Sequence, residues 1–352
     1  MGHRYKAVGW NGAKAVYDFY AAACVAGFLA VFMYVGLEGP ESGHAGDPVI
    51  LLIRGLGLCA FLMLTAILLI GPLARVSTRF SPFLYNRRHL GVMTFTVAAA
   101  HVALTLLWYH GAGPLNPFVS LLVSNAFYDS PAGIPFEIFG LGAFVILFLM
   151  AATSHDYWLN NLSAPVWKAL HMLVYVAYGL LIAHIAYGLL MTERSAVLAA
   201  TAISSFGLVA GAHLLAGLRE WRRDGGMAGV NAPEGWLDVC APDDIPDKRA
   251  VIAPLPGGER VAVFRDGPKV MAVTNVCRHQ NGPLGEGRIV DGCVTCPWHG
   301  WQYDPETGIS PPPFTEKIAT HDVRLSRLGR VFVRVKPNRP GARAKSALVS
   351  AP

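Results

Sequence analysis

Two short segments in the C-terminal third of the chain each place a cysteine close to a histidine. The first is Cys-Arg-His at 277–279 and the second is Cys-Pro-Trp-His at 296–299. Two thiolates and two imidazoles form the ligand set of a [2Fe–2S] cluster in which one iron takes both cysteines and the other takes both histidines. A zinc site can use the same residue types, but zinc ligands usually pair cysteine with cysteine and histidine with histidine locally. The segments therefore favour an iron–sulfur cluster over zinc, with the candidate ligands Cys277, His279, Cys296 and His299.

Four further histidines lie inside apolar sequence, namely His101, His171, His184 and His213. Ionisable side chains are costly in a membrane and usually have a function there, although any single one can also be a hydrogen-bonded packing residue. Four of them on three predicted helices weaken that alternative. Histidines that face each other inside a helical bundle can be the axial ligands of a b-type heme. The sequence therefore indicates a heme site in addition to the cluster site.

The composition predicts a membrane domain that carries these histidines. Of the 352 residues, 53% are hydrophobic and 15% are charged, whereas a soluble domain has about 25% charged residues. Runs long enough to span a bilayer follow an N-terminal arm at 1–15. They cover 16–37, 49–72, 89–109, 136–153, 169–191 and 196–218. We therefore expect an all-α bundle of six transmembrane helices over 16–218.

The Lys and Arg residues indicate the orientation of this bundle. They gather in alternate connections: in the N-terminal arm, around 75–88, at Lys168 and at 219–223, whereas 110–135 has none. Such residues mark the cytoplasmic side of a membrane protein. We expect both termini to be cytoplasmic and the protein to lie in a membrane such as the bacterial inner membrane. Because the basic residues flank apolar runs, the net charge of +6 indicates topology and not nucleic-acid binding.

The remaining sequence predicts a small all-β domain. A polar, Gly-rich stretch at 219–232 is typical of a linker. Short β-rich segments separated by Gly, Pro and Asp then continue over 233–337, as expected for a compact all-β domain. The last residues, 338–352, are rich in Pro, Gly, Ser and basic residues, and we expect them to be disordered.

The predicted β domain resembles the Rieske [2Fe–2S] domain over essentially all of 233–337. Besides the two Cys/His segments, the shared features are Asn-Gly-Pro-Leu at 281–284, Gly-Trp-Gln-Tyr-Asp at 300–304, Thr-Gly at 307–308 and the prolines at 311–313. The resemblance implies that the two cysteines bind one iron and the two histidines bind the other.

Two departures place the domain near the ferredoxin and ring-hydroxylating-oxygenase branch of that family. High-potential Rieske proteins carry one further cysteine in each loop and a serine after the His-Gly of the second loop. Here these neighbourhoods contain Asn281 or Gly282, Trp298 and Trp301. With fewer hydrogen-bond donors to the sulfurs, the resemblance implies a reduction potential toward the low end of the Rieske range.

The membrane region resembles the ferric reductase-like transmembrane domain over roughly 50–218. The resemblance rests on Arg-His-Leu-Gly at 88–91 leading to His101, and on Trp-Lys-Ala-Leu-His at 167–171 leading to His184. It implies that His101 and His184 bind heme b, with His171 as a further candidate. Members of that family usually carry a second histidine fourteen residues before the one at 101, and Arg87 stands there instead. One heme is therefore expected, and a second is left open.

These features predict a membrane electron-transfer protein. Single electrons would pass between a cytoplasmic donor, a Rieske cluster, heme b and an acceptor in the membrane or outside. A membrane-bound Rieske oxygenase or desaturase is the first alternative, but it needs an iron held by two histidines and a carboxylate. Residues 300–352 offer only His321 beside Asp322. A non-catalytic redox sensor anchored in the membrane is the second alternative.

Overall fold

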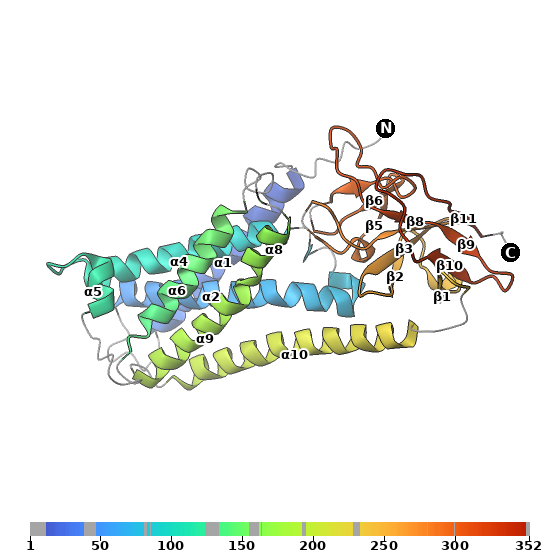
Figure 1. The fold of residues 1–352 in the computed structure, drawn as a ribbon. Coiled ribbons are helices and arrows are strands. Elements are labelled where there is room, and N and C mark those ends of the chain that lie inside the picture. Colours follow the sequence, from blue (N-terminus) through green and yellow to red (C-terminus); the bar gives the residue numbers. More distant parts are fainter. Residues whose placement is uncertain are drawn as a thin grey trace.

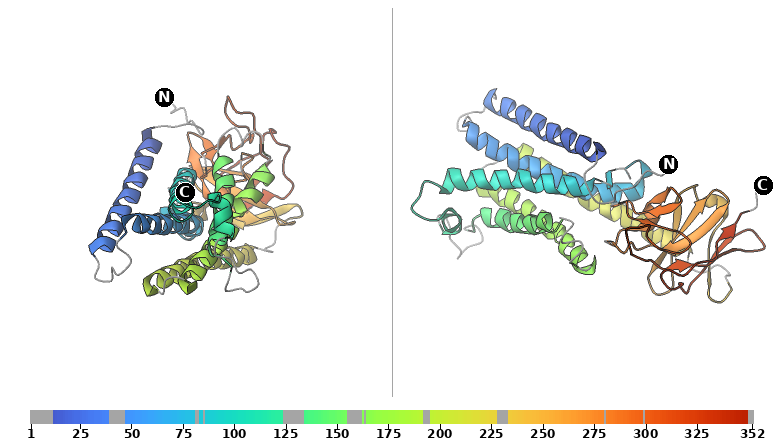
Figure 2. Two further views of the ribbon diagram at one scale, coloured as in Figure 1. Left: turned by 90° about the vertical axis from the view of Figure 1, so that its left-hand side faces the viewer. Right: turned by 90° about the horizontal axis from the view of Figure 1, so that it is seen from above.

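Helices form the first part of the molecule and a β domain forms the rest (Figure 1). The computed structural model describes residues 12–38, 47–80, 83–84, 86–123, 134–154, 162, 164–191, 195–227, 233–279, 281–298 and 300–349. The helices run lengthwise beside one another, and the β domain lies against one end of them, as Figure 2 shows from two further directions. The all-α and all-β parts are therefore arranged end to end.

The helical part consists of α1 (Gly12–Glu38), α2 (Pro48–Val76), η1 (Thr78–Phe80), α4 (Arg87–His110), α5 (Pro117–Val123), α6 (Glu137–Ala152), α8 (Ala164–Met172), α9 (Val174–Met191) and α10 (Ala196–Met227). The start of α2 shows how local sequence sets a boundary. The Asp47 carboxylate accepts hydrogen bonds from the backbone N–H groups of Val49 and Ile50, and Pro48 occupies the first helical position. Both features stabilise a helix N-terminus.

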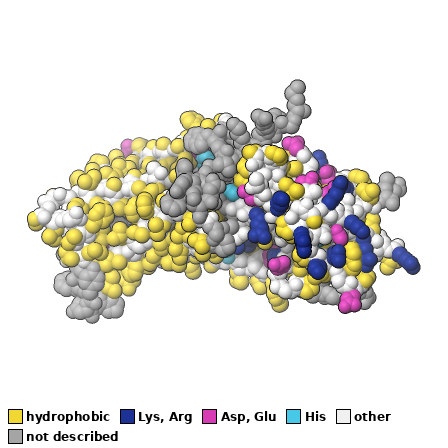
Figure 3. All heavy atoms as spheres, turned by 45° about the horizontal axis from the view of Figure 1, so that its top comes forward, with side chains coloured by type: hydrophobic (Ala, Val, Ile, Leu, Met, Phe, Trp, Pro, Cys, Tyr) yellow, Lys and Arg dark blue, Asp and Glu magenta, His cyan; other side chains and the backbone are white. Residues whose placement is uncertain are grey.

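Five described helices are long and apolar enough to cross a membrane. They are Ala15–Glu38, Pro48–Val76, Arg87–His110, Val166–Leu189 and Ala196–Arg222, of which the fourth combines α8 and α9. Apolar side chains cover the visible surface of the helical part, whereas Lys and Arg are gathered over the β domain (Figure 3). The chain is therefore an integral membrane protein. The remaining predicted span, 136–153, corresponds to α6, which has 16 residues, or about 24 Å at 1.5 Å per residue, and is shorter than a typical span.

Helix α2 occupies the centre of the membrane part. Leu64 and Phe61 of α2 are 3% and 2% exposed and pack in a cluster with Ala143 of α6 and Tyr178 of α9. The hydroxyl groups of Thr65 and Tyr178 lie 3.0 Å apart and form a buried hydrogen bond between α2 and α9. This contact ties the α6–α9 pair to the α2 side of the bundle.

Two predicted boundaries are wrong in the described residues. Helix α10 continues to Met227, so 219–227 is helical and not linker; Arg219 donates to the carbonyl of Val76 at 3.1 Å and supports this extension. Strand β11 (Ala347–Leu348) pairs with β4 (Lys269–Thr274), so the predicted disordered tail is ordered through 349. The other predicted linker residues, 228–232, and 350–352 lie outside the described residues.

The described residues of the β domain form three antiparallel sheets. Its other strands are β1 (Trp236–Cys240), β2 (Ala250–Pro254), β3 (Arg260–Asp266), β5 (Arg288–Val290), β6 (Cys293–Thr295), β7 (Gln302–Tyr303), β8 (Thr320–His321), β9 (Val323–Leu325) and β10 (Val331–Arg334). The strand orders are β1-β10-β9, then β11-β4-β3-β2 with β8 on β4, and β5-β6-β7. The predicted small all-β domain is present, and the third sheet carries part of the candidate cluster site.

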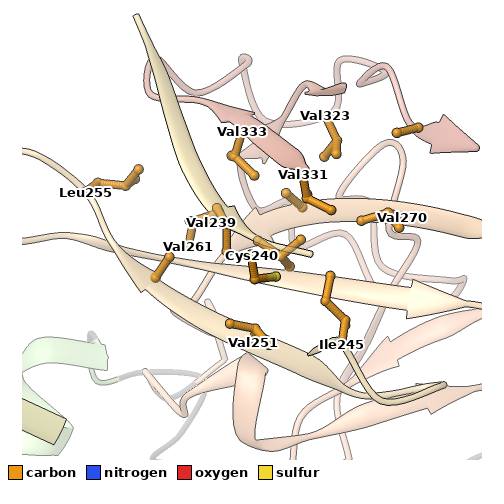
Figure 4. Packing of buried hydrophobic residues seen from close by; sticks show 14 residues of the cluster. Val239, Cys240, Ile245, Val251, Leu255, Val261, Val270, Val323, Val331 and Val333 are labelled. Atoms are coloured by element: carbon orange, nitrogen blue, oxygen red, sulfur yellow. The ribbon is translucent and has the colours of Figure 1, made fainter. Parts of the chain in front are cut away.

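Strand β3 separates two hydrophobic cores. Residues 261–264 of β3 are all fully buried, so its sequence is continuously apolar and does not alternate. Val261 and Val263 face the core drawn in Figure 4, where they meet valines of β1 and β10. Ala262 and Phe264 face a second core on the other side, which contains Cys277, Cys296, Trp301 and Tyr303. The second core therefore packs between β3 and the two candidate cluster loops and supports both loops.

Candidate functional site

Two loops of the β domain have the same hydrogen-bonded frame. The first cluster loop, residues 277–282, follows β4, and the second cluster loop, residues 296–301, joins β6 to β7. The backbone N–H of Cys277 donates to the carbonyl of Gly282 at 2.9 Å, and the N–H of Cys296 donates to the carbonyl of Trp301 at 2.8 Å. Each cysteine is thus bonded to the residue five positions later. Both cysteines start a closed loop of the same length.

A second pair of hydrogen bonds tightens each loop. The N–H of Asn281 donates to the carbonyl of Cys277, and the N–H of Gly300 donates to the carbonyl of Cys296, both at 2.8 Å. Asn281 and Gly300 have φ angles of 56° and 69°, a left-handed region that Gly and Asn adopt most readily. The residue types at these two positions are therefore what allow both loops to close.

The loops place their candidate ligands in a buried, closely packed site. Cys277 and Cys296 are 1% and 2% exposed. A Cβ atom added to Gly282 would lie 2.8 Å from the Cys296 Sγ, which shows that the first loop passes directly over the cysteine of the second. The ring of His279 stacks on Trp301, with centroids 4.2 Å apart and planes 10° apart. His299 lies outside the described residues.

This donor set fits an iron–sulfur cluster. One buried thiol comes from each loop, and the glycine between them leaves the space at the sulfur that a side chain would fill. Thiolates are ligands of such a cluster, and the burial of both cysteines limits the access of water to the site, which is one factor that sets a reduction potential. The described residues place Cys277, Cys296 and His279 at the same end of the β domain.

Tyr303 is a further site residue that the sequence analysis missed. Its hydroxyl oxygen accepts the backbone N–H of Arg278 at 3.1 Å and lies 3.4 Å from the Cys277 Sγ. A thiolate that binds iron has no hydrogen to give, so the Tyr303 hydroxyl would be the donor in that state. Burial, and next the adjacent Cys277, raise the pKa of Tyr303, so the hydroxyl keeps its proton. The Cys277 sulfur therefore has a candidate hydrogen-bond donor in Tyr303. Tyr303 was missed because only the residues of the two loops were compared with those of high-potential Rieske proteins. The sequence did contain a clue, because Tyr303 belongs to the Gly-Trp-Gln-Tyr-Asp segment at 300–304 that is shared with the Rieske domain.

The membrane histidines His101 and His184 have matching surroundings. The Nδ1 atom of His101, on α4, lies 2.8 Å from the carbonyl oxygen of Ile53 on α2. The Nδ1 atom of His184, on α9, lies 2.9 Å from the carbonyl oxygen of Phe136 at the start of α6. Because a carbonyl only accepts, Nδ1 carries the hydrogen in both rings. Nε2 is then the nitrogen with a lone pair, as an axial heme ligand requires.

A glycine lies beside each of these rings. A Cβ atom on Gly57 of α2 would come within 3.0 Å of the His101 ring, and one on Gly140 of α6 would come within 2.9 Å of the His184 ring. Each glycine is four residues after the accepting carbonyl, on the same face of its helix. The neighbouring helix thus supplies both a hydrogen-bond acceptor and the space for the imidazole. This arrangement fits two oriented heme ligands.

The other described histidines of the helical part differ from this pair. The Nδ1 atom of His171 bonds to the carbonyl of Trp167 on its own helix at 3.0 Å, and its ring stacks on Trp167 at 3.7 Å. The Nε2 atom of His213 lies 3.0 Å from the hydroxyl of Tyr175, and the Nδ1 atom of His89 lies 2.9 Å from the carboxylate of Asp18. The structure therefore separates His171 from the matched pair, although the sequence placed all three among the candidate ligands.

The cluster loops lie near the point where the β domain meets the helices. Arg75 of α2 forms an ion pair with Glu286 of η4 (Leu284–Glu286), with Nε and Oε1 3.1 Å apart. The guanidinium of Arg87, the first residue of α4, lies 5.2 Å from the ring centroid of Trp298 in the second cluster loop. Arg260 of β3 and Glu220 of α10 form another ion pair at 2.8 Å. These contacts hold the cluster end of the β domain on the helical part.

His321 does not extend the site to a second metal. It is 2% exposed, and its Nδ1 atom lies 2.9 Å from the carbonyl of Arg334 on β10. The Asp322 carboxylate accepts hydrogen bonds from Asn338, Arg334 and the backbone of Lys345. Within the described residues, which do not include His299, no three His, Cys, Asp or Glu side chains form a group that could hold a metal ion. Nothing there matches the iron site that an oxygenase needs.

Comparison with known proteins assigns the two parts of the chain. Residues 56–182 match the family described as ferric reductase like transmembrane component, and residues 235–322 match the Rieske [2Fe–2S] domain. The heme-binding subunit MsrQ of protein-methionine-sulfoxide reductase from Caulobacter vibrioides is 32% identical over 169 residues, which are 48% of this chain and 73% of that protein. The chain belongs to the ferric reductase-like transmembrane family and carries a Rieske [2Fe–2S] domain.

The Rieske part has relatives among ferredoxins. The ferredoxin subunit of anthranilate 1,2-dioxygenase from Burkholderia cepacia is 33% identical over 91 residues, which are 26% of this chain and 83% of that protein. A chain in the complex of reduced oxygenase and oxidized ferredoxin of carbazole 1,9a-dioxygenase is 27% identical, with a TM-score of 0.29. That similarity covers 30% of this chain and 99% of that one. Both predicted family resemblances are confirmed, and the predicted cluster type and heme b agree with these findings.

Proposed function

We propose that this protein passes single electrons across a membrane, between a cytoplasmic donor and an acceptor in the membrane or on its far side. A Rieske cluster would receive or deliver electrons at the cytoplasmic end, and heme b would do so deeper in the helical part. The observation that carries the proposal is the linear order of the two sites. The second cluster loop contacts the start of α4 at Arg87, and His101 follows fourteen residues farther along that helix, with His184 on α9 as its counterpart.

We assign the cluster ligands as Cys277 and Cys296 on one iron, with His279 and His299 on the other. Burial of both thiols and the shared frame of the two loops support this assignment. We assign His101 and His184 as the axial ligands of one heme b. The two backbone carbonyls that orient their rings support this, as does the heme-binding name of the relatives that match this region. The proposed membrane domain has six helices, with α6 as its short member.

The bound groups would supply reversible one-electron chemistry, in which no bond forms or breaks. The residues of the chain orient and shield these groups. The carbonyls of Ile53 and Phe136 fix the tautomer and the plane of the two imidazoles. The apolar core beneath the loops keeps water from the thiols of Cys277 and Cys296, and the Tyr303 hydroxyl, 3.4 Å from the Cys277 sulfur, would donate to a thiolate there. The chain thus sets the positions and potentials of its cofactors.

The distribution of Lys and Arg supports a cytoplasmic Rieske domain. The ends of α2, α4 and α10 that meet the β domain carry Arg75, Arg87 and Arg219, whereas the α5 end of the bundle lies in a stretch without Lys or Arg. Basic residues favour the cytoplasmic side. Electrons from the cytoplasm would then enter at the Rieske domain.

Membrane vesicles of defined orientation test the proposal. In inside-out vesicles, a membrane-impermeant one-electron reductant should reduce the heme rapidly in the wild type and much more slowly in Cys296→Ser. In right-side-out vesicles the same reductant should not distinguish the two proteins. Equal heme reduction by both proteins in inside-out vesicles would show that electrons do not pass through the cluster. Absence of either cofactor from the purified protein would also contradict the proposal.

A further inference from the structure

A group of charged residues, which includes the half-buried Arg87, lies where the second cluster loop meets the helices. The guanidinium of Arg87 faces the ring of Trp298, which stands between Cys296 and His299 in the sequence of the loop. A Cβ atom on Gly71 of α2 would lie 3.7 Å from a terminal nitrogen of Arg87, so α2 leaves space for the guanidinium. A cation is therefore held against the loop that carries two of the four proposed cluster ligands.

The groups around Arg87 do not cancel its charge. Arg75 of α2, Glu286 of η4 and Tyr175 of α9 are the titratable groups that act on it. Glu286 is already paired with Arg75, at 3.1 Å, and its side chain is 20% exposed. Burial raises the pKa of the Glu286 carboxyl, and Arg75 acts in the opposite direction. Two cations and one anion leave one net positive charge beside the loop.

The position of this charge matters for a redox group. A [2Fe–2S] cluster gains one electron and hence one negative charge when it is reduced. A nearby cation stabilises the reduced state more than the oxidised state, because the reduced state carries the additional negative charge. Net charge around a cluster is among the factors that set its reduction potential. The positive charge of Arg87, a residue of the membrane domain, should therefore raise the reduction potential of the cluster on the Rieske domain.

We propose that Arg87 is a positioning residue that seats the second cluster loop on the membrane domain and raises the reduction potential of the Rieske cluster. This inference rests on the proposed function, because it requires the cluster. It makes the potential of the cluster depend on its contact with the helices. The reduction potential of the cluster is thereby adjusted by the membrane domain to which the Rieske domain is attached.

The test is a redox titration of the cluster, monitored by electron paramagnetic resonance, in the full chain purified with both cofactors. Arg87→Gln removes the charge and should lower the midpoint potential. Arg87→Lys keeps the charge and should restore the potential to near the wild-type value, although it loses the planar stacking of guanidinium on Trp298. Glu286→Gln removes the anion and should raise the potential. Arg222→Ala, at an exposed position of α10, is the matched control and should leave it unchanged.

The signs of the shifts decide the outcome. If Arg87→Gln and Glu286→Gln both leave the potential unchanged while cluster and heme contents stay normal, Arg87 has no such role. A shift of equal size in Arg87→Lys and Arg87→Gln would show a purely structural effect of the guanidinium and overturn the proposal. If Arg87→Gln fails to fold, the upward shift in Glu286→Gln is still required. A wild-type protein without a cluster signal would instead contradict the proposed function.

Discussion

His101 and His184 occupy equivalent positions in two helix pairs. Each ring bonds through Nδ1 to a backbone carbonyl 48 residues earlier, and each has a glycine beside it four residues after that carbonyl. The carbonyls lie at 53 and 136, the glycines at 57 and 140, and the histidines at 101 and 184, so all three shift by 83 residues. The pairs α2–α4 and α6–α9 therefore each present one histidine in the same way. This regularity favours one heme held by two ligands of the same kind.

The first prediction concerns these two ligands. His101→Ala and His184→Ala should each remove the heme, because a six-coordinate b-type heme needs both axial nitrogens. His171→Ala should keep it, because the His171 ring is bonded and stacked within its own helix. Heme content per chain, measured from the pyridine hemochrome spectrum, tests both statements. Full heme content in His184→Ala would refute the assignment, and loss of half the heme in His171→Ala would reveal a second site.

The second prediction concerns the glycines beside the rings. In Gly140→Ala the new Cβ would stand 2.9 Å from His184, so the ring must move or the helices must separate. Such overpacking costs about 1–3 kcal/mol. We expect a lower thermal midpoint and an altered heme spectrum. Gly207→Ala, where nothing lies within 4 Å, is the control and should behave like the wild type. Identical spectra for the two variants would show that Gly140 does not position His184.

How far the sequence predicts this site depends on the kind of contact involved. Cys277 and Cys296 are recognisable because their thiols and spacing are chemically distinctive. The carbonyls of Ile53 and Phe136 are not, since every residue has a carbonyl and only the packing of α2 and α6 directs these two at imidazoles. The contact of Arg87 with Trp298 depends on how two domains meet, which no local pattern contains.

The errors in the boundaries have a related cause. Arg219 lies in a polar, Gly-rich stretch that is typical of a linker, but its contact with Val76 lets α10 continue past the apolar run. The tail has a disordered composition, yet Arg343 pairs with Glu306 and Ala347 pairs with Val270 on β4. A polar composition indicates that a segment cannot form a hydrophobic core of its own. Contacts with the rest of the molecule can still order that segment.

The third prediction concerns Tyr303. A hydrogen bond from Tyr303 to the Cys277 sulfur would stabilise the reduced cluster, which is the more negative state. Tyr303→Phe removes this donor and should therefore lower the midpoint potential. A hydrogen bond of about 0.5–1.5 kcal/mol corresponds to a fall of about 20–60 mV in the midpoint potential for one electron. Ser310→Ala, which removes the partner of the Trp301 indole without touching a sulfur, should change the potential much less. A rise in the Tyr303→Phe potential would contradict the direction of this hydrogen bond.

The fourth prediction concerns the independence of the two cofactor sites. Cys296→Ser should abolish the Rieske paramagnetic signal but leave the heme content near normal, because His101 and His184 are held by helices alone. Cys293→Ser is the matched control three residues away. Burial raises the pKa of the Cys293 thiol, so it should stay protonated, and its substitution should leave the cluster intact. Loss of heme in Cys296→Ser would show that the helical part needs the Rieske domain in order to fold.

The fifth prediction concerns the ion pair that joins the two parts. Glu286→Arg places a third cation beside Arg75 and Arg87, and the repulsion should separate η4 from α2. Arg75→Glu should have a smaller effect, because Arg87 still balances part of the negative charge of Glu286 and the new glutamate. The double variant Arg75→Glu/Glu286→Arg restores opposite charges. A partly exposed pair contributes up to about 1 kcal/mol, so amide exchange at 284–287 should rise about fivefold in Glu286→Arg and fall back in the double variant. The variants should keep their heme, because the pair lies away from His101. If the double variant exchanges as fast as Glu286→Arg, the pair does not hold the Rieske domain on the helices.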